Sequence, residues 1–279
     1  MQCLVLCVNF NNDEESLIFA KSIANQRDFH GSIYIISCSI IKINSPLRNI
    51  VDKRIKVIDP GLNLGYFGGA AAGLKEYLIQ NQLPKWIIVS NTDIKFADNL
   101  FFKTLDTIHN SDAPAILAPD IQLQQKSLSA STPTSQNPAM LKRPSRVKLQ
   151  LLAIICKWKL TYTAYEVIIE FKWGLINRLF KKKEQAIMSA RDIYAAFGAC
   201  IIFHHTYFEL GGDLEFGSFL FGEEIYVAEK ARQFGLRTHF EPRLRLIHQE
   251  HSTTGALGAA RRQKNVYNSL IYLLKEFFY

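Results

Sequence analysis

Cysteine is scarce in this chain, and long apolar runs are missing. The five cysteines are scattered over 279 residues, and their spacing matches no metal-binding motif. We interpret them as reduced thiols of a cytoplasmic protein. No apolar run reaches the roughly 18 residues that a membrane-spanning helix requires. The chain starts with a strand-like run and no basic leader, so a secretory signal is not expected.

Acidic residues are scarce in only one segment of the chain, residues 141–183. The whole chain carries a formal net charge of +8. Residues 141–183 hold eleven Lys or Arg against two Glu, a net charge of +9, which leaves −1 for the rest. The basicity therefore belongs to that segment and not to the fold. A hydrophobic content of 48% and a charged content of 21% are typical of a globular protein rather than a disordered one.

Strand and helix signals alternate along the chain. The predicted strands are 4–8, 32–38, 54–58, 86–89, 115–118, 195–203 and 237–240, and the predicted helices are 14–26, 70–79, 98–109, 149–180 in one or two pieces, 222–234 and 261–278. Residues 122–146 are polar and rich in Pro, which indicates an exposed crossing segment. This β-α-β order predicts an α/β fold with a mostly parallel sheet and helices on both faces.

The tripeptide Asn91-Thr92-Asp93 directly follows the apolar run Trp86–Ser90. A buried strand that ends this way presents a carboxylate at the carboxyl edge of a sheet, where ligands of open α/β sheets bind. Such a carboxylate suits Mg²⁺ or Mn²⁺, and these ions suit a diphosphate. The same three residues are also ordinary turn and N-cap chemistry, so the rest of the chain must decide.

Three further clusters have residue types that suit chemistry on a diphosphate donor. Glycines at 65, 68, 69 and 73 precede a helix whose N-terminus favours anions, although close strand–helix packing explains them equally well. The acidic pair Glu223-Glu224 opens a helix after an aromatic stretch. Acidic residues in a first helical turn are favoured by the helix dipole, and a carboxylate beside apolar walls is also a natural general base. His248, with His251 three residues on, could bind metal or phosphate, or lie hydrogen-bonded at the surface.

Taken together, the motifs resemble the family 2 glycosyltransferases, in particular the bacterial rhamnosyltransferase-like branch. The matching residues are Val8-Asn-Phe-Asn11, Asn63-Leu-Gly-Tyr-Phe-Gly-Gly69, Ser90-Asn-Thr-Asp93, Phe197-Gly-Ala-Cys-Ile-Ile202, Phe219-Leu-Phe-Gly-Glu-Glu224, and His248 with Ser252. The resemblance covers about residues 2–255. It implies a GT-A fold and an inverting transfer of a hexosyl or deoxyhexosyl group from a nucleotide-diphospho-sugar to a saccharide. The saccharide acceptor would be lipid-linked, and the reaction would belong to the synthesis of a bacterial surface polysaccharide such as O-antigen.

The resemblance also implies roles for individual residues. Asp93 and His248 would bind a divalent cation, Mg²⁺ or Mn²⁺, and Glu224 would be the catalytic base, with Glu223 as its rival. The implied donor-binding residues are Asn9, Asn11, Asn63, Gly65, Gly68, Gly69, Asn91 and Asp93. The sequence departs from the family pattern in four places: Asn91 and Glu224 stand where Asp is usual, Ala70 stands where Asn is common, and Ser37–Ile40 contains no acid to contact the nucleoside. A non-catalytic homologue that binds nucleotide-sugar or scaffolds a polysaccharide complex is therefore the alternative.

We interpret residues 1–279 as a single domain with a basic amphipathic helical insert at 141–190 and a C-terminal amphipathic helix at 259–279. The insert contains two of the three tryptophans, Trp158 and Trp173. Amphipathic helices rich in Lys, Arg and Trp suit an anionic membrane surface, which would make the protein peripheral on the inner face of the cell membrane. The alternative is an insert that packs on the core or on a second copy in a homo-oligomer. Nucleic acid is not an expected partner, because no nucleic-acid motif is present.

Overall fold

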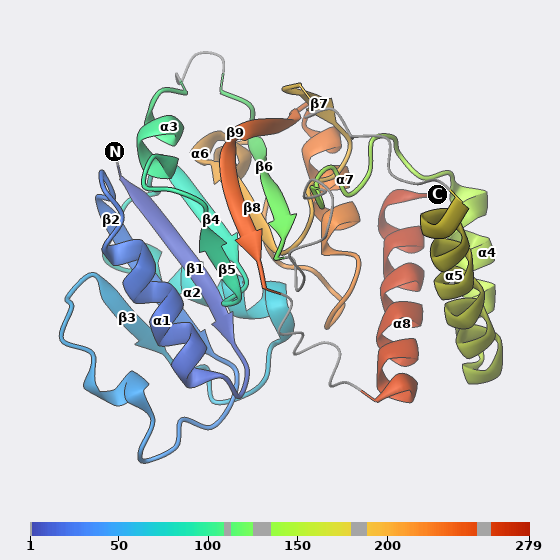
Figure 1. The fold of residues 1–279 in the computed structure, drawn as a ribbon, viewed down its shortest axis with the longest axis horizontal. Coiled ribbons are helices and arrows are strands. Elements are labelled where there is room, and N and C mark those ends of the chain that lie inside the picture. Colours follow the sequence, from blue (N-terminus) through green and yellow to red (C-terminus); the bar gives the residue numbers. More distant parts are fainter. Residues whose placement is uncertain (1, 109–112, 125–134, 180–188, 250–257) are drawn as a thin grey trace.

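The structure is a computed structural model that describes residues 2–108, 113–124, 135–179, 189–249 and 258–279 (Figure 1). In the helix at residues 159–179 it describes the whole backbone, but only the side chains of residues 159–169 and 171. The strands are β1 (Cys3–Asn9), β2 (Gly31–Ser37), β3 (Ile55–Ile58), β4 (Trp86–Ser90), β5 (Ile94–Phe96), β6 (Ile116–Leu123), β7 (Arg191–Ile193), β8 (Cys200–His204) and β9 (Thr238–His248). The helices are α1 (Asp13–Ala24), the 3-10 helix η1 (Pro46–Asn49), α2 (Gly65–Leu78), α3 (Phe101–Asp106), α4 (Arg146–Lys157), α5 (Lys159–Leu179), α6 (His205–Glu209), α7 (Glu223–Gln233) and α8 (Ala259–Phe277).

One nine-stranded sheet runs through the molecule in the order β3-β2-β1-β4-β8-β6-β9-β5, with β7 paired to β9. The four strands from β3 to β4 are mutually parallel, and β6 and β9 are parallel to each other. Because β8 is antiparallel to both β4 and β6, these six strands all point the same way. Only β8, β5 and β7 of the nine strands run in the opposite direction. The predicted α/β fold with a mostly parallel sheet is therefore confirmed.

The second half of the sheet departs most from the sequence prediction. The strand expected to end at Phe240 continues as β9 to His248, and the expected strand at 195–203 begins only at Cys200. The short elements β5, β7 and α6 were not predicted. A strand of three residues, such as β5 or β7, is too short for an alternation of apolar and polar side chains to be recognised. In β9, Arg243 to Leu246 alternate polar and apolar as a strand does, but Pro242 stands directly before them, and a proline within a run argues against a continuous strand.

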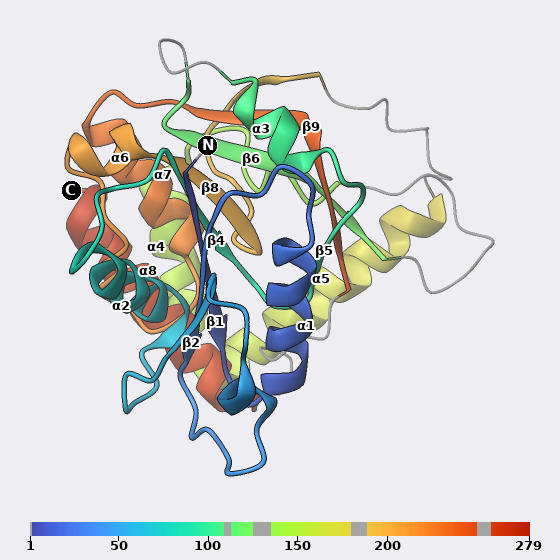
Figure 2. The ribbon, with the colours of Figure 1, turned by 90° about the vertical axis from the view of Figure 1, so that its left-hand side faces the viewer.

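Alternating side chains of the strands build a separate core on each face of the sheet. Cys3, Val5 and Cys7 of β1 pack with α1 and α3, whereas Leu4 and Leu6 pack with residues of α2, α7 and α8. Figure 2 shows the sheet between these layers, with α1 and α3 on one side and α2, α7 and α8 on the other. The prediction of helices on both faces is borne out.

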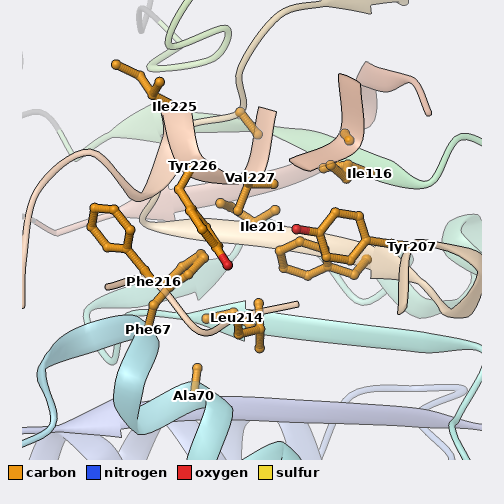
Figure 3. Close-up of a cluster of buried hydrophobic side chains, with 14 of the residues drawn as sticks. Phe67, Ala70, Ile116, Ile201, Tyr207, Leu214, Phe216, Ile225, Tyr226 and Val227 are labelled. Carbon is orange, nitrogen blue, oxygen red and sulfur yellow. The ribbon is translucent and has the colours of Figure 1, made fainter. Parts of the chain in front are cut away.

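The helix α7 is anchored by its apolar side. Ile225, Tyr226 and Val227 lie in the core that also contains Ile201 of β8 and Phe67 of α2 (Figure 3). All five are at most 7% exposed. This packing determines where the first turn of α7, with its two glutamates, stands relative to the sheet.

Two helices of the predicted insert, α4 and α5, form a further layer on the side of α8 that faces away from the sheet (Figure 1). Leu149, Ala153 and Cys156 form the buried stripe of α4, and α4 makes extensive contacts with α8. The remainder of the insert, residues 180–188, lies outside the described residues. None of the described helices is both long enough and apolar enough to cross a membrane.

Candidate functional site

Asp93 and His248 are brought together by the pairing of β5 with β9. Asp93 lies between β4 and β5, and the next residue, Ile94, is the register partner of His248 at the end of β9. The backbone N–H of Gln249 donates to the Asp93 carbonyl oxygen over 2.9 Å. Two residues 155 positions apart in the chain thus meet at the carboxyl edge of the sheet.

The side chains of Asp93 and His248 face each other in a buried setting. His248 Nε2 lies 3.2 Å from Asp93 Oδ1, and each residue is only 8% exposed. Asp93 Oδ1 nevertheless has no hydrogen-bond partner. His248 Nδ1 lies 2.8 Å from Gln136 Oε1, an oxygen that can only accept, so Nδ1 carries the proton and donates. Nε2 then faces Asp93 Oδ1 as the donor of an ion pair when the ring is protonated, and with its lone pair when the ring is neutral.

This arrangement fits a bound cation. A buried carboxylate oxygen without a partner is costly, and a metal ion held by both atoms satisfies both. Two ligands at about 2.1 Å and a right angle lie about 3 Å apart, close to the observed separation of Asp93 Oδ1 and His248 Nε2. Gln136 would be the outer partner that orients the histidine. Among the described residues, no group of three His, Cys, Asp or Glu side chains is placed to hold a metal. The remaining ligands would therefore come from water or a substrate.

The two glutamates at the start of α7 have different surroundings. Glu224 is partly buried, and its Oε1 accepts a hydrogen bond from the backbone N–H of Gly198 over 3.2 Å. Glu223 is 7% exposed, and its Oε1 accepts from the N–H of Phe221 over 3.1 Å. Burial raises the pKa of both carboxyl groups, and the neighbouring Glu224 charge raises the pKa of Glu223 further. Ser269 of α8 donates its hydroxyl to the Phe221 carbonyl oxygen and so ties this turn to α8.

Tyr66, in the first turn of α2, contacts the loop that holds Glu224. Its hydroxyl donates to the Gly198 carbonyl oxygen over 2.9 Å, while the N–H of that same residue is bound to Glu224. The pKa of Tyr66 is raised well above its usual value, chiefly by burial and in part by the negative charges of Glu223, Glu224 and Asp93. Residues 197–199 link the two groups directly, because the Phe197 ring lies 6.1 Å from the His248 ring, the Gly198 N–H donates to Glu224, and the Ala199 carbonyl oxygen accepts from the Asn91 N–H.

The predicted donor-binding glycines at positions 65, 68 and 69 are present for different structural reasons. Gly65 has φ +75°, and a Cβ atom there would lie 2.1 Å from the Phe219 carbonyl oxygen, so this position requires glycine. A Cβ at Gly69 would lie 2.9 Å from Val8 Cγ1, which is the predicted alternative of close helix–strand packing. A Cβ at Gly68 would meet only Leu64 of its own turn. Asn63 Oδ1 accepts from the Gly65 N–H over 3.0 Å and shapes the entry to α2.

The predicted residues Asn9, Asn11 and Asn91 contribute mainly to the backbone of the same edge. Asn9 Nδ2 donates to Asp13 Oδ1 over 2.7 Å, and its Oδ1 accepts from the Asn12 N–H over 3.0 Å. The Asn11 N–H, at an exposed turn with φ +58°, donates to Ser39 Oγ over 2.9 Å. The Asn91 N–H donates to the Ala199 carbonyl oxygen over 2.8 Å, which ties the acidic tripeptide to the loop before β8.

Sequence reasoning missed Tyr66, Gln136 and the role of Gly198. Gly198 lies inside Phe197–Ile202, one of the segments that carry the resemblance, but the spacing of that segment does not reveal that Gly198 contacts a glutamate. Gln136 lies in a polar segment that was interpreted as an exposed loop. Tyr66 stands among the glycines of its motif as one aromatic residue of several. Their functional placement depends on contacts across 26 to 132 positions in the chain.

Two cavities of the described structure lie elsewhere. One of about 360 Å³ lies between α4, α5 and α8 and is lined mainly by apolar residues such as Leu152, Ile169 and Leu270. Another of about 220 Å³ is lined by Arg143, Arg232 and others. Neither contains a residue of the Asp93 and Glu224 cluster, so the candidate site is assigned from its polar geometry and not from cavity size.

Comparison with solved structures identifies the fold. A structure of GalNAc-T7 with UDP, GalNAc and Mn²⁺ aligns with 99% of this chain and 50% of its own, at a TM-score of 0.63 and 16% identity. Two structures of S. aureus TarS each align with 99% of this chain at a TM-score of 0.50. They are TarS 1–349, at 10% identity over 72% of its length, and TarS, at 12% over 44%. These proteins are GT-A-type glycosyltransferases, and the chain has the GT-A fold that the resemblance implied.

The likeness has clear bounds. At 10% to 16% identity it establishes the fold alone. The chain spans about half the length of the GalNAc-T7 structure that it matches. No family model matches the sequence, and neither does any curated protein.

Gly198 offers a direct test of the geometry around Glu224. A Cβ atom at this position would lie 2.8 Å from Glu224 Oε1, closer than a methyl group and a carboxylate oxygen can approach. We expect Gly198→Ala to displace the Glu224 side chain, and to lower any activity that depends on it by about 10²-fold, the order of a misplaced catalytic group. The measurement is a steady-state rate beside circular dichroism and a melting curve. A folded Gly198→Ala protein with the wild-type rate would show that Glu224 is not used there.

Proposed function

We propose that this protein is an inverting glycosyltransferase that moves a sugar from a nucleotide-diphospho-sugar to a hydroxyl group of a saccharide. The observation that carries the proposal is that Phe197 and Gly198 contact His248 and Glu224 respectively at the carboxyl edge of the sheet, where His248 also faces Asp93. The acidic tripeptide alone would be turn chemistry. A buried carboxylate beside a histidine nitrogen and a glutamate with a raised pKa together suit group transfer from a diphosphate.

Glu224 is proposed as the general base, in preference to Glu223. Glu224 is the less buried of the two, so an acceptor hydroxyl can reach it, and the Gly198 N–H orients its carboxylate. Its raised pKa makes it a better proton acceptor than an ordinary glutamate. The carboxylate takes the proton as the acceptor oxygen bonds to the anomeric carbon. The bond from that carbon to the diphosphate oxygen breaks on the opposite face, which inverts the configuration.

The donor diphosphate is proposed to lie beside Asp93 and His248, which would hold Mn²⁺ or Mg²⁺. When bound, the ion offsets negative charge on the diphosphate leaving group. GalNAc-T7, which shares the fold, was solved with UDP and Mn²⁺, which supports this assignment. Asn63, Gly65, Gly68 and Gly69 at the start of α2 are proposed to border the donor, together with Asn9, Asn11 and Asn91 at the strand ends.

The acceptor is proposed to be a lipid-linked saccharide in the synthesis of a bacterial surface polysaccharide, and the sugar a hexose or deoxyhexose. This finer assignment depends on the resemblance to the rhamnosyltransferase-like branch. It places the protein in the cytoplasm or peripherally on the inner face of the cell membrane, where such acceptors are available.

A second candidate function is a non-catalytic homologue that binds nucleotide-sugar or scaffolds a polysaccharide complex. Two observations favour it: Asn91 stands at a position where the family uses Asp, and Ser37–Ile40 offers no acid to the nucleoside. Such a homologue would bind a nucleotide-sugar without hydrolysing or transferring it, and this result would distinguish it from the enzyme.

A nucleotide-sugar panel with and without Mn²⁺ tests the proposal. A donor at 100 times its dissociation constant stabilises the native state by about 2.7 kcal/mol, so a matching donor should raise the melting temperature by several degrees. The enzyme should also hydrolyse that donor slowly and release the nucleoside diphosphate. Stabilisation without hydrolysis or transfer would favour the non-catalytic homologue. If no donor stabilises the protein, the enzyme and the nucleotide-sugar-binding homologue are both wrong, and only the scaffold remains.

A further inference from the structure

Two stripes of large apolar side chains lie exposed on the outer helices α4 and α5. They are Val147, Leu151, Ile154 and Trp158 along α4 and its C-terminal end, and Leu160, Val167, Ile168 and Phe171 on α5. Each of the eight is between 56% and 86% exposed. Single exposed apolar residues are normal on a protein surface, but contiguous apolar patches mark sites of interaction.

The positions of these residues follow helical periodicity. Residues 147, 151 and 154 are spaced four and three apart, so they form one face of α4, and Trp158 follows directly after its C-terminal end. The opposite face of α4, formed by Leu149, Ala153 and Cys156, is already buried. α5 repeats the arrangement, with Tyr162 buried on the face opposite its exposed stripe. Both helices are therefore apolar on two faces, and only one face of each is covered.

Basic side chains border the exposed stripe of α4. At about 100° per residue, Arg146 and Lys157 fall on one side of the stripe and Lys148 on the other. All three are exposed, as is Lys159 at the start of α5. Residues 141–183 together carry a net charge of +9, whereas the rest of the chain sums to −1. The surface thus combines an apolar centre with a cationic border.

The charge of this surface selects its partner. In a two-fold dimer the same patch would meet itself, so the lysines of one copy would face those of the other. Nucleic acid would pair with the lysines but leave the eight apolar side chains without an apolar partner. An anionic lipid bilayer satisfies both features, because its headgroups attract the cations and its acyl region receives the apolar stripe.

We propose that the outer face of α4 and α5 is a docking surface for an anionic lipid bilayer, with both helices lying in the plane of the interface. α8 separates these helices from the sheet (Figure 1), so docking leaves the candidate site untouched. The inference stands apart from the proposed chemistry, since lipid binding needs neither Asp93 nor Glu224.

Vesicle co-sedimentation of the full chain tests this surface. We expect the wild type to bind vesicles of equal parts phosphatidylcholine and phosphatidylglycerol, and to bind pure phosphatidylcholine far more weakly. Each cation near an anionic surface contributes about fivefold to partitioning, so Lys148→Glu with Lys157→Glu should weaken binding by roughly 25-fold or more. Trp158→Ser with Phe171→Ser should weaken it by about tenfold or more, since two large apolar side chains no longer enter the interface.

Matched controls come from the loop between β2 and β3. Ile40→Ser with Val51→Ser removes two apolar side chains that are 91% and 92% exposed, and Lys42→Glu with Lys53→Glu makes the same change of charge. Both control proteins should bind as the wild type does, and circular dichroism should show every variant folded. The proposal is overturned if the α4–α5 variants sediment like their controls, or if the wild type does not prefer anionic vesicles. It is equally overturned if sedimentation velocity shows a dimer that requires Trp158 and Phe171.

Discussion

Glu224→Gln should leave the protein folded and lower sugar transfer by about 10² to 10⁴-fold. A positioned general base accelerates a reaction by about that factor, and the glutamine amide cannot take up the proton of the acceptor hydroxyl. The substitution is nearly isosteric, and its amide oxygen can still accept the Gly198 N–H, so the geometry of the site is kept. Glu223→Gln should cost much less, because Glu223 is more deeply buried and bound to Phe221. The measurement is a transfer rate with the donor found in the panel.

The pH dependence of the transfer rate is a second test of the role of Glu224. Burial raises the folded-state pKa of Glu224, so the base form is lost as pH falls through that raised value and the wild-type rate should rise with pH across it. For a carboxyl group whose pKa is raised by folding, the charged form destabilises the native state as pH increases. Glu224→Gln removes that cost, so its melting temperature at pH 8 should match or exceed that of the wild type. A matched control is Glu276→Gln on the exposed side of α8. Undiminished transfer by Glu224→Gln would remove this residue from the mechanism.

Asp93→Asn should abolish the Mn²⁺-dependent part of donor binding and lower transfer by about 10²-fold or more. The change preserves shape but removes the charge whose Oδ1 has no hydrogen-bond partner. A metal ion contributes several kcal/mol of charge stabilisation, and 1.36 kcal/mol corresponds to tenfold in rate. The measurement is the thermal shift produced by donor with and without Mn²⁺, together with the transfer rate. His248→Gln should act in the same direction, because it removes the nitrogen that lies 3.2 Å from Asp93.

Controls separate a metal role from a structural one. Asp106→Asn, on the exposed side of α3, removes the same charge at a distance from β5 and β9 and should leave Mn²⁺ dependence unchanged. Direct titration of Mn²⁺ by electron paramagnetic resonance in the presence of donor should show weaker binding in Asp93→Asn, even if transfer is too slow to measure. Wild-type Mn²⁺ affinity in that variant would contradict the placement of the ion at Asp93.

Much of the first half of the fold could be predicted from the sequence. The strands of the parallel half are apolar runs buried on both faces, such as Trp86–Ser90, which local composition makes visible. The placement of Asp93 at the carboxyl end of a strand and of Glu223 and Glu224 in a first helical turn also follows from neighbouring residues. The basic, doubly apolar segment was recognisable in the same way, although which of its faces stays exposed was not.

What the sequence by itself determined is local: periodicity and charge are properties of neighbouring residues, and they specify the strands, the helices and the chemistry offered at their ends. Only the tertiary structure decided which of these ends meet. Asp93 reaches His248 because the three-residue strand β5 pairs with an unexpectedly long β9. Glu224 reaches the same site because Gly198 has no side chain to exclude it. Such pairings depend on packing between distant segments, whose free energy is shared across the whole sheet and leaves no pattern in any one stretch of sequence.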